Sequence, residues 1–153
     1  MRTFVKYWLP VLLWVAVITV LSRSEFQSEL TYRWLRAAVG FFLPEVSAST
    51  LLKINGALRK LAHVTEYFVL AVLVWRGLRR GAVVSWQWRW AWGTLALGLL
   101  LAALDELHQH FEPGRSASLA DVGFDSLGVL LALLVVDAWQ RARSFGTGPP
   151  PPL

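Results

Sequence analysis

The chain contains no cysteine. A disulfide framework, a thiolate nucleophile and a zinc site built on cysteine are therefore excluded, and cysteine usage carries no information about the compartment. Charged residues are also scarce: they make up 16% of the 153 residues, against about a quarter in an ordinary soluble domain. Although the net charge is +5, no block of consecutive lysines or arginines resembles a nucleic-acid-binding arm, so we expect no nucleic-acid partner.

Long apolar runs are what the chain does contain. Hydrophobic residues make up 56% of it, and each run is close to the roughly 20 residues that cross a bilayer as an α-helix. The sequence predicts an all-α membrane protein, a bundle of about four transmembrane helices. The predicted spans are residues 4–21, 61–78, 91–108 and 122–139. We expect a single transmembrane domain over residues 1–145 and a disordered, proline-rich tail over 146–153.

The first apolar run has two interpretations. A basic start followed by about 14 apolar residues is also typical of a signal peptide. After Leu21, however, the sequence continues Ser22-Arg23-Ser24-Glu25, in which we find no small-x-small cleavage site. We therefore expect an uncleaved first helix.

The distribution of basic residues predicts the orientation of the spans. The connection from Arg76 to Arg89 is rich in arginine, whereas the connection after the third span contains only Arg115. The positive-inside rule therefore places both termini in the cytoplasm, in a multi-pass protein of the cytoplasmic (inner) membrane. The segment 22–60 contains six basic residues, which favours the opposite orientation. It also contains three glutamates and is long, and the positive-inside rule applies less strictly to long segments.

Two further patterns are typical of membrane interfaces. Six tryptophans predict an aromatic belt near the arginine-rich connection: Trp75, Trp86, Trp88, Trp90, Trp92 and Trp139. Between the first two spans, Phe26, Leu30, Trp34, Ala37 and Phe41 recur at helical spacing. This spacing predicts an amphipathic helix that ends near Leu43 and lies on the outer leaflet or caps the bundle. Ser47 or Ser49 could then cap a further helix that leads into the second span.

Ionisable and polar residues gather at the extracytoplasmic ends of three spans. They are Arg59, Lys60, His63, Glu66 and Tyr67 of the second span, Asp105, Glu106 and Gln109 of the third, Asp121 and Asp125 of the fourth, and Arg115 just before it. A charged side chain that faces lipid costs at least about 2.5 kcal/mol, so we expect these groups to face the interior of the bundle. Their convergence at one depth predicts a functional site there.

The members of this cluster also have structural interpretations. Lys60 could simply extend to the headgroups. His63 could be a neutral histidine bonded to a neighbouring helix, and Asp121 could form a capping box with Ser118. Asp125 lies beyond the first turn, so capping does not explain it. A purely structural ion network stays open, although so many ionisable groups are a costly source of stability.

A family resemblance rests on the same residues. The run from Leu104 to Arg115, LDELHQHFEPGR, with Ser118, Asp121 and Gly128 after it, resembles the VanZ-like family pattern D-E-x-x-Q-x-F-x-P-G-R. The upstream Lys60, His63 and Tyr67 resemble its K-x-x-H-x-x-x-Y element. The matched positions are Lys60, His63, Tyr67, Asp105, Glu106, Gln109, Arg115 and Asp121. Asp125 stands where the family usually has Asn, which adds a carboxylate to an acidic site.

The resemblance implies a small polytopic protein of the bacterial inner membrane and cell envelope. The named member of the family is associated with low-level resistance to the glycopeptide antibiotic teicoplanin. Besides membrane lipids, the implied partner is therefore a lipid-linked envelope precursor or a glycopeptide. The sequence makes no prediction about the oligomeric state.

Three hypotheses follow for the function. In the first, the outer site binds an envelope component, such as a lipid-linked glycan headgroup or a glycopeptide. The substrate-binding residues would be Lys60, Glu66, Tyr67, Asp105, Gln109, Arg115 and Asp125. In the second, the protein is an intramembrane enzyme acting on lipid headgroups, with His63, Glu106 and Asp121 as catalytic groups and Arg115 as a clamp. In the third, it is an ion-coupled transporter, but no polar residues continue toward the cytoplasmic side.

We expect no cofactor. Within the enzyme hypothesis, carboxylates could hold a divalent cation through oxygen ligands. Those carboxylates would be Glu66, Asp105 or Glu106, and Asp121 or Asp125. No ligand spacing in the sequence is diagnostic of a metal, so the identity of any metal ligand stays unknown.

Overall fold

A computed structural model of the chain describes residues 2–22, 29–82, 86–111 and 118–146. These residues form no strand; their helices are α1 (Arg2–Leu21), α2 (Glu29–Phe42), α3 (Ala48–Arg79), α4 (Trp88–His110) and α5 (Leu119–Gly146). Helices α1, α3, α4 and α5 are long and apolar enough to cross a membrane. The predicted all-α, multi-pass membrane fold is therefore confirmed.

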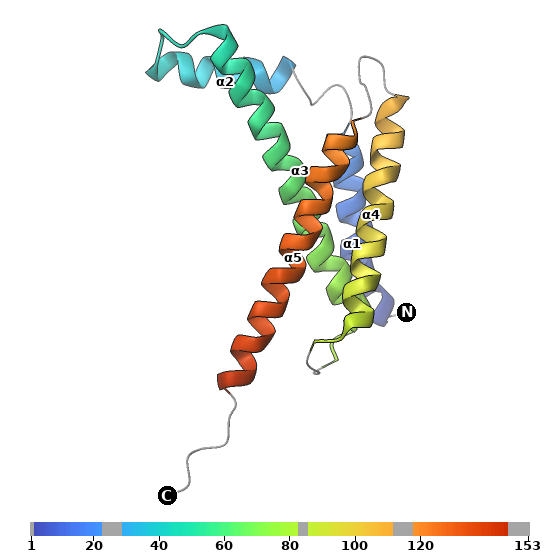
Figure 1. Ribbon diagram of the computed structural model, residues 1–153. Helices are drawn as coiled ribbons and strands as arrows, with labels where there is room; N and C mark the ends of the chain where they lie inside the picture. Colours follow the sequence, from blue (N-terminus) through green and yellow to red (C-terminus); the bar gives the residue numbers. More distant parts are fainter. Residues whose placement is uncertain (1, 23–28, 83–85, 112–117, 147–153) are drawn as a thin grey trace, which may run out of the picture.

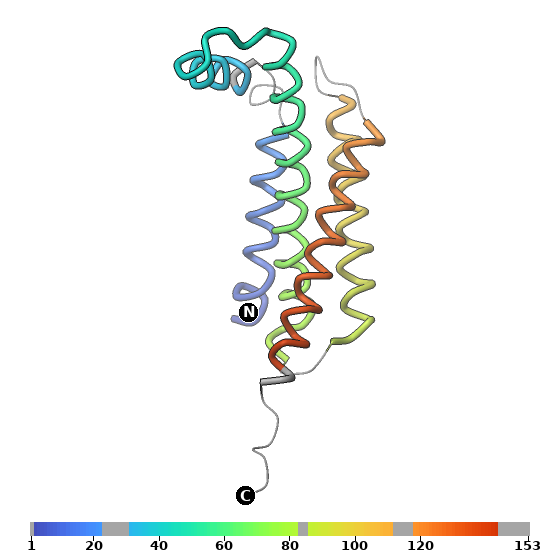
Figure 2. Tube along the Cα trace, turned by 60° about the vertical axis from the view of Figure 1, so that its left-hand side comes forward, coloured from blue at the N-terminus to red at the C-terminus, as the bar shows by residue number. Residues whose placement is uncertain are grey.

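The four long helices run alongside one another, and α2 lies across one end of the bundle (Figures 1 and 2). We call this end the α2 end. The start of α1, the end of α3 and the end of α5 lie at the opposite end (Figure 1). Helix α3 contacts each of the other helices and packs most extensively against α5, which it crosses at an angle. The position of α3 therefore determines how the residues of the predicted site meet.

Helix α3 is longer than predicted. The sequence predicts a span over 61–78 and a separate capped helix before it, but the two form one continuous helix of 32 residues. Ser47 is its N-cap, and the Ser47 side chain accepts a hydrogen bond from the backbone N–H of Thr50 at 3.2 Å. At 1.5 Å per residue the helix is about 48 Å long, which exceeds the about 30 Å of hydrocarbon. Its first turns therefore extend beyond the other spans and meet α2.

Helix α2 matches the predicted amphipathic segment, although Phe26 lies outside the described residues. The side chains of Trp34, Phe41 and Phe42 are 71%, 82% and 78% exposed. Large exposed aromatic side chains on a short helix at the end of a membrane bundle are typical of a helix that lies in the bilayer interface. The predicted amphipathic helix is therefore present, and it lies across one end of the bundle.

The bundle interior contains two apolar clusters. The larger one lies between α1, α3, α4 and α5 and contains Val11, Ile18, Tyr67, Leu70, Ala71, Val74, Ala102, Val129 and Ala132. The smaller one lies at the opposite end, where Trp75 stacks on Trp86 at 4.7 Å between centroids and Trp90 packs edge-on against Trp75 at 6.0 Å. Trp75 and Trp90 are thus interior residues, whereas Trp88 is exposed as an aromatic belt requires.

The C-terminal end of α5 differs slightly from the prediction. Gly146, which the sequence places in the tail, is the last residue of the helix. The Asp137–Arg141 ion pair, with 2.8 Å between Oδ2 and Nε, has the i,i+4 spacing that supports this last part of α5. The remaining residues of the predicted tail, 147–153, lie outside the described residues.

Candidate functional site

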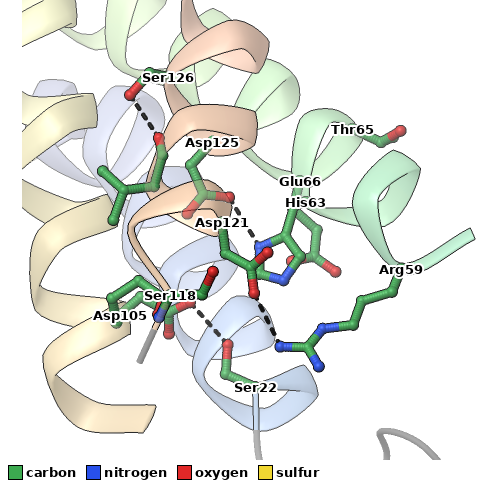
Figure 3. Close-up of polar contacts among 12 residues, drawn as sticks. Ser22, Arg59, His63, Thr65, Glu66, Asp105, Ser118, Asp121, Asp125 and Ser126 are labelled. Carbon is green, nitrogen blue, oxygen red and sulfur yellow. Dashed lines mark hydrogen bonds and ion pairs between the residues drawn. The ribbon is translucent and has the colours of Figure 1, made fainter. Parts of the chain in front are cut away.

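Polar side chains from α3, α4 and α5 meet inside the bundle near the α2 end, as Figure 3 shows for several of them. The predicted site residues among them are His63, Asp105, Glu106, Gln109, Asp121 and Asp125, and each is at least 91% buried. Ser22, the residue that follows the end of α1, joins them and was not among the predicted site residues. The structure therefore brings together the three predicted helix ends and adds the residue that follows a fourth helix.

His63 and Asp125 form the innermost pair of the site. The distance from His63 Nδ1 to Asp125 Oδ1 is 2.9 Å, and the two side chains are 6% and 0% exposed. Their helices meet closely because Gly128 lies one turn beyond Asp125 on α5. A Cβ atom at Gly128 would overlap the carbonyl oxygen of Val64 on α3. The absence of a side chain at Gly128 thus allows the backbones of α3 and α5 to approach closely, which brings His63 and Asp125 within hydrogen-bond distance.

Arg59 and Asp121 form a second ion pair, with 3.0 Å between Nη2 and Oδ2. Arg59 is one of the residues that gather at this end of the second span, but the residue predicted to bind a ligand is Lys60. Lys60 is exposed, and its Nζ lies 5.2 Å from the centroid of the Phe124 ring. Arg59 precedes His63 by one full turn and therefore lies on the same face of α3. This i,i+4 spacing is the signal that could have identified Arg59.

Asp105 and Glu106 are adjacent in α4, but they accept hydrogen bonds from different parts of the chain. Oδ2 of Asp105 accepts hydrogen bonds from Ser22 Oγ at 3.0 Å and from Gln109 Nε2 at 2.8 Å. Oε2 of Glu106 accepts the backbone N–H of Ser118 at 2.7 Å, just before α5 begins. In a capping box, the side chain of Asp121 would accept this N–H. Here Glu106 accepts it, so the Asp121 carboxylate can pair with Arg59.

A pocket of about 300 Å³ opens beside these pairs, between α1, α2 and the first half of α3. Its polar wall includes Arg59, His63 and Glu66, and Thr31 of α2 lines its outer side. Leu21, Leu58 and Ala62 supply apolar surface in the same pocket. His63 and Glu66 are thus the predicted site residues that reach the pocket.

The other predicted residues take different places. Tyr67 lies in the apolar core and, with Asp105, lines a smaller pocket of about 200 Å³ between α1, α3 and α4. Asp121 and Asp125 lie behind the first pocket, where they hold Arg59 and His63. Arg115, for which the sequence predicts a clamp, lies outside the described residues.

The site has more hydrogen-bond acceptors than donors. Among the described residues of the site, three buried oxygen atoms have no hydrogen-bond partner, Glu106 Oε1, Gln109 Oε1 and Asp125 Oδ2, against one buried donor nitrogen, Arg59 Nε. Buried polar atoms are normally satisfied, so an unpaired group marks a place where a further donor fits. In the described part of the chain, no three histidine or acidic side chains are grouped so that they could hold a metal ion. The divalent-cation interpretation therefore gains no support from these residues.

Comparison with known proteins identifies one family. A family model described as VanZ/LLP1 matches residues 7–140, which covers most of the chain. This match confirms the resemblance that rests on the LDELHQHFEPGR run. No match was found among curated proteins or among solved structures.

Proposed function

This chain belongs to the VanZ-like family, and we propose that its site at the α2 end binds the polar headgroup of an envelope component. The ligand would be a lipid-linked glycan or a glycopeptide in the bacterial inner membrane. The observation that carries this proposal is the pocket beside the His63–Asp125 pair, which combines a charged wall with apolar surface. An amphiphile whose polar group reaches the membrane interior needs both kinds of surface.

The charges in the pocket favour a headgroup that carries both signs. A guanidinium has five N–H donors, and the ion pair with Asp121 uses one terminal nitrogen of Arg59. The remaining donors suit a phosphate or carboxylate of the ligand. Glu66 lies on the same wall and suits an ammonium or hydroxyl group. A zwitterionic or polar headgroup fits this arrangement better than a purely anionic one.

Two neighbouring substitutions test the binding site. We expect Arg59→Gln to weaken binding of teicoplanin or of a polyprenyl-linked glycan by about 10-fold or more, because a charge-assisted hydrogen bond contributes about 1.5–3 kcal/mol. Lys60→Gln removes the same charge from the next residue, which is exposed on another face of α3. We expect it to change affinity less than about 2-fold. Binding is measured on the purified full-length protein in nanodiscs.

The paired result also decides between the two basic residues. If both substitutions lower the affinity equally, Lys60 also contacts the ligand, as the sequence predicts. If neither probe binds the wild-type protein, or if neither substitution changes its affinity while both variants stay folded, the proposed function is wrong.

We further propose that the α2 end is extracytoplasmic and that both termini are cytoplasmic. The proposal rests on the positive-inside rule, because arginines are concentrated between α3 and α4. The absence of natural cysteine makes single-cysteine labelling clean. An impermeant thiol reagent added to intact cells should label Phe111→Cys, which is exposed at the α2 end, and should label Arg89→Cys only after permeabilisation. The reverse pattern would overturn the orientation.

Catalysis on the bound headgroup is the second candidate, and one observation favours it. The bond from His63 Nδ1 to the buried Asp125 fixes the imidazole ring, which leaves Nε2 as the nitrogen that could act on a ligand. An oriented histidine on a pocket wall suits a general base. His63→Gln should then abolish turnover of a headgroup substrate while its binding persists. A wild-type protein that binds the probe without any turnover would exclude this candidate.

A further inference from the structure

The end of the bundle opposite α2 is strongly basic. Eight lysines and arginines lie in the helices or the connection at this end: Arg2, Lys6, Arg76, Arg79, Arg80, Arg89, Arg141 and Arg143. The acidic residue described there, Asp137, is already paired with Arg141. Positive charge therefore greatly exceeds negative charge at this end of the protein, and the ligand that fits it is an anion.

A groove of about 650 Å³ opens on this end between α1, α3 and α5. Lys6, Arg76 and Arg79 line it, and none of the described residues that line it is acidic. The apolar and aromatic part of its lining consists of Tyr7, Phe68, Val72, Trp75, Val135, Val136 and Trp139. The groove thus joins a basic rim to a long apolar floor, on the opposite side of the membrane from the site around His63.

Two of the cations converge on one ring. Lys6 Nζ lies 5.3 Å and Arg76 Cζ lies 5.4 Å from the centroid of the Tyr7 ring. Both positive charges therefore lie beside the same aromatic ring at the rim of the groove. A phosphate at this rim would be attracted by both charges and could accept hydrogen bonds from their N–H groups.

The depth of the groove fits an acyl chain below that phosphate. Phe68 precedes Arg76 by eight residues, which corresponds to about 12 Å along the helix axis. Trp75 and Val72 contribute apolar surface to the groove between these two residues.

We propose that this groove, bounded by Lys6, Arg76 and Trp75, is a binding site for an anionic phospholipid. The phosphate lies between the basic side chains, and one acyl chain lies along Phe68 and Val72. Basic pockets between transmembrane helices are a recognised setting for anionic lipids. The inference concerns the end of the bundle away from the His63 site and does not depend on the proposed function.

Native mass spectrometry of the full-length protein, titrated with phosphatidylglycerol or phosphatidylcholine, tests the site. We expect the wild-type protein to retain phosphatidylglycerol preferentially. The double variant Lys6→Gln/Arg76→Gln should lower this retention by about 100-fold, since each charge-assisted hydrogen bond to the bound phosphate strengthens binding by about 10-fold or more. The control Arg80→Gln/Arg89→Gln removes the same charge from exposed residues outside the groove and should change retention less than about 3-fold.

A second variant tests the groove without changing its charge. Val135 lines the groove and is 54% exposed, so the larger side chain of Val135→Trp would occupy the space in which we propose that the acyl chain lies. Loss of phosphatidylglycerol from this variant, with an unchanged melting temperature, supports a lipid held in the groove. Full retention would show that the lipid is attracted only to the basic surface, which overturns the proposed site. Equal binding of the two lipids by the wild-type protein would overturn it as well.

Discussion

Replacing His63 with alanine is expected to lower the free energy of unfolding by about 3 kcal/mol or more. The Asp125 side chain is 0% exposed, and its Oδ1 has His63 as its partner at 2.9 Å. Without the imidazole, a buried carboxylate loses that partner, and the removal of one partner of a buried pair typically costs about 3–5 kcal/mol. Unfolding of the purified protein in mixed micelles, followed by circular dichroism, measures the change.

A double-mutant cycle separates this effect from lost packing. The variant with both His63→Ala and Asp125→Ala should be less destabilised than the sum of the single variants, because it leaves no unpaired carboxylate inside the bundle. We expect a coupling of about 1–3 kcal/mol. Additive effects would mean that the two side chains do not stabilise each other.

His110→Ala provides the matched control for the histidine substitution. His110 is exposed near the end of α4, where its ring packs edge-on against Phe111. Its removal should change the free energy of unfolding by no more than about 0.5 kcal/mol, as is usual for exposed positions. A comparable loss in both variants would indicate a general response to histidine removal rather than a buried pair.

The sequence predicted where the polar side chains gather because a membrane restricts where charge can lie. A carboxylate within an apolar span must face the protein interior or water, so Asp105, Glu106 and Asp125 had to face inward. The structure places all three in the interior. The same physical constraint predicted the four spans. Both predictions needed only the identity of the residues and their positions along the chain.

The pairing of side chains could not be predicted in the same way. Arg59 and Lys60 lie four and three residues before His63, and both spacings are compatible with one helix face. Which of them reaches Asp121 depends on how α3 is rotated against α5, and that is fixed by packing between residues far apart in the sequence. Likewise, a local capping box with Ser118 was one interpretation of Asp121, but Glu106 from α4 supplies the acceptor for the Ser118 N–H. In both cases a residue from another helix decides which side chains pair, and a local sequence pattern does not show such a contact.

Gly128→Ala is expected to lower the free energy of unfolding by about 2 kcal/mol or more, despite the addition of one methyl group only. The new Cβ would overlap the Val64 carbonyl oxygen and would lie 3.0 Å from the backbone nitrogen of Phe68. Both neighbours are backbone atoms of α3 and cannot rotate away, so α5 must move as a whole. Because Asp125 is one turn away, the displacement should also lengthen the contact to His63 and weaken ligand binding in the nanodisc assay.

Gly123→Ala distinguishes this backbone contact from a general intolerance of glycine substitution in α5. Nothing lies within 4 Å of a Cβ atom built at Gly123. Alanine is favoured over glycine by about 1 kcal/mol inside a helix, so this variant should be as stable as the wild type or slightly more stable. The same helix preference acts at Gly128, where it opposes the overlap. A stable Gly128→Ala protein with unchanged ligand affinity would therefore mean that α3 and α5 do not cross in backbone contact, and that the His63–Asp125 pair is positioned by other residues.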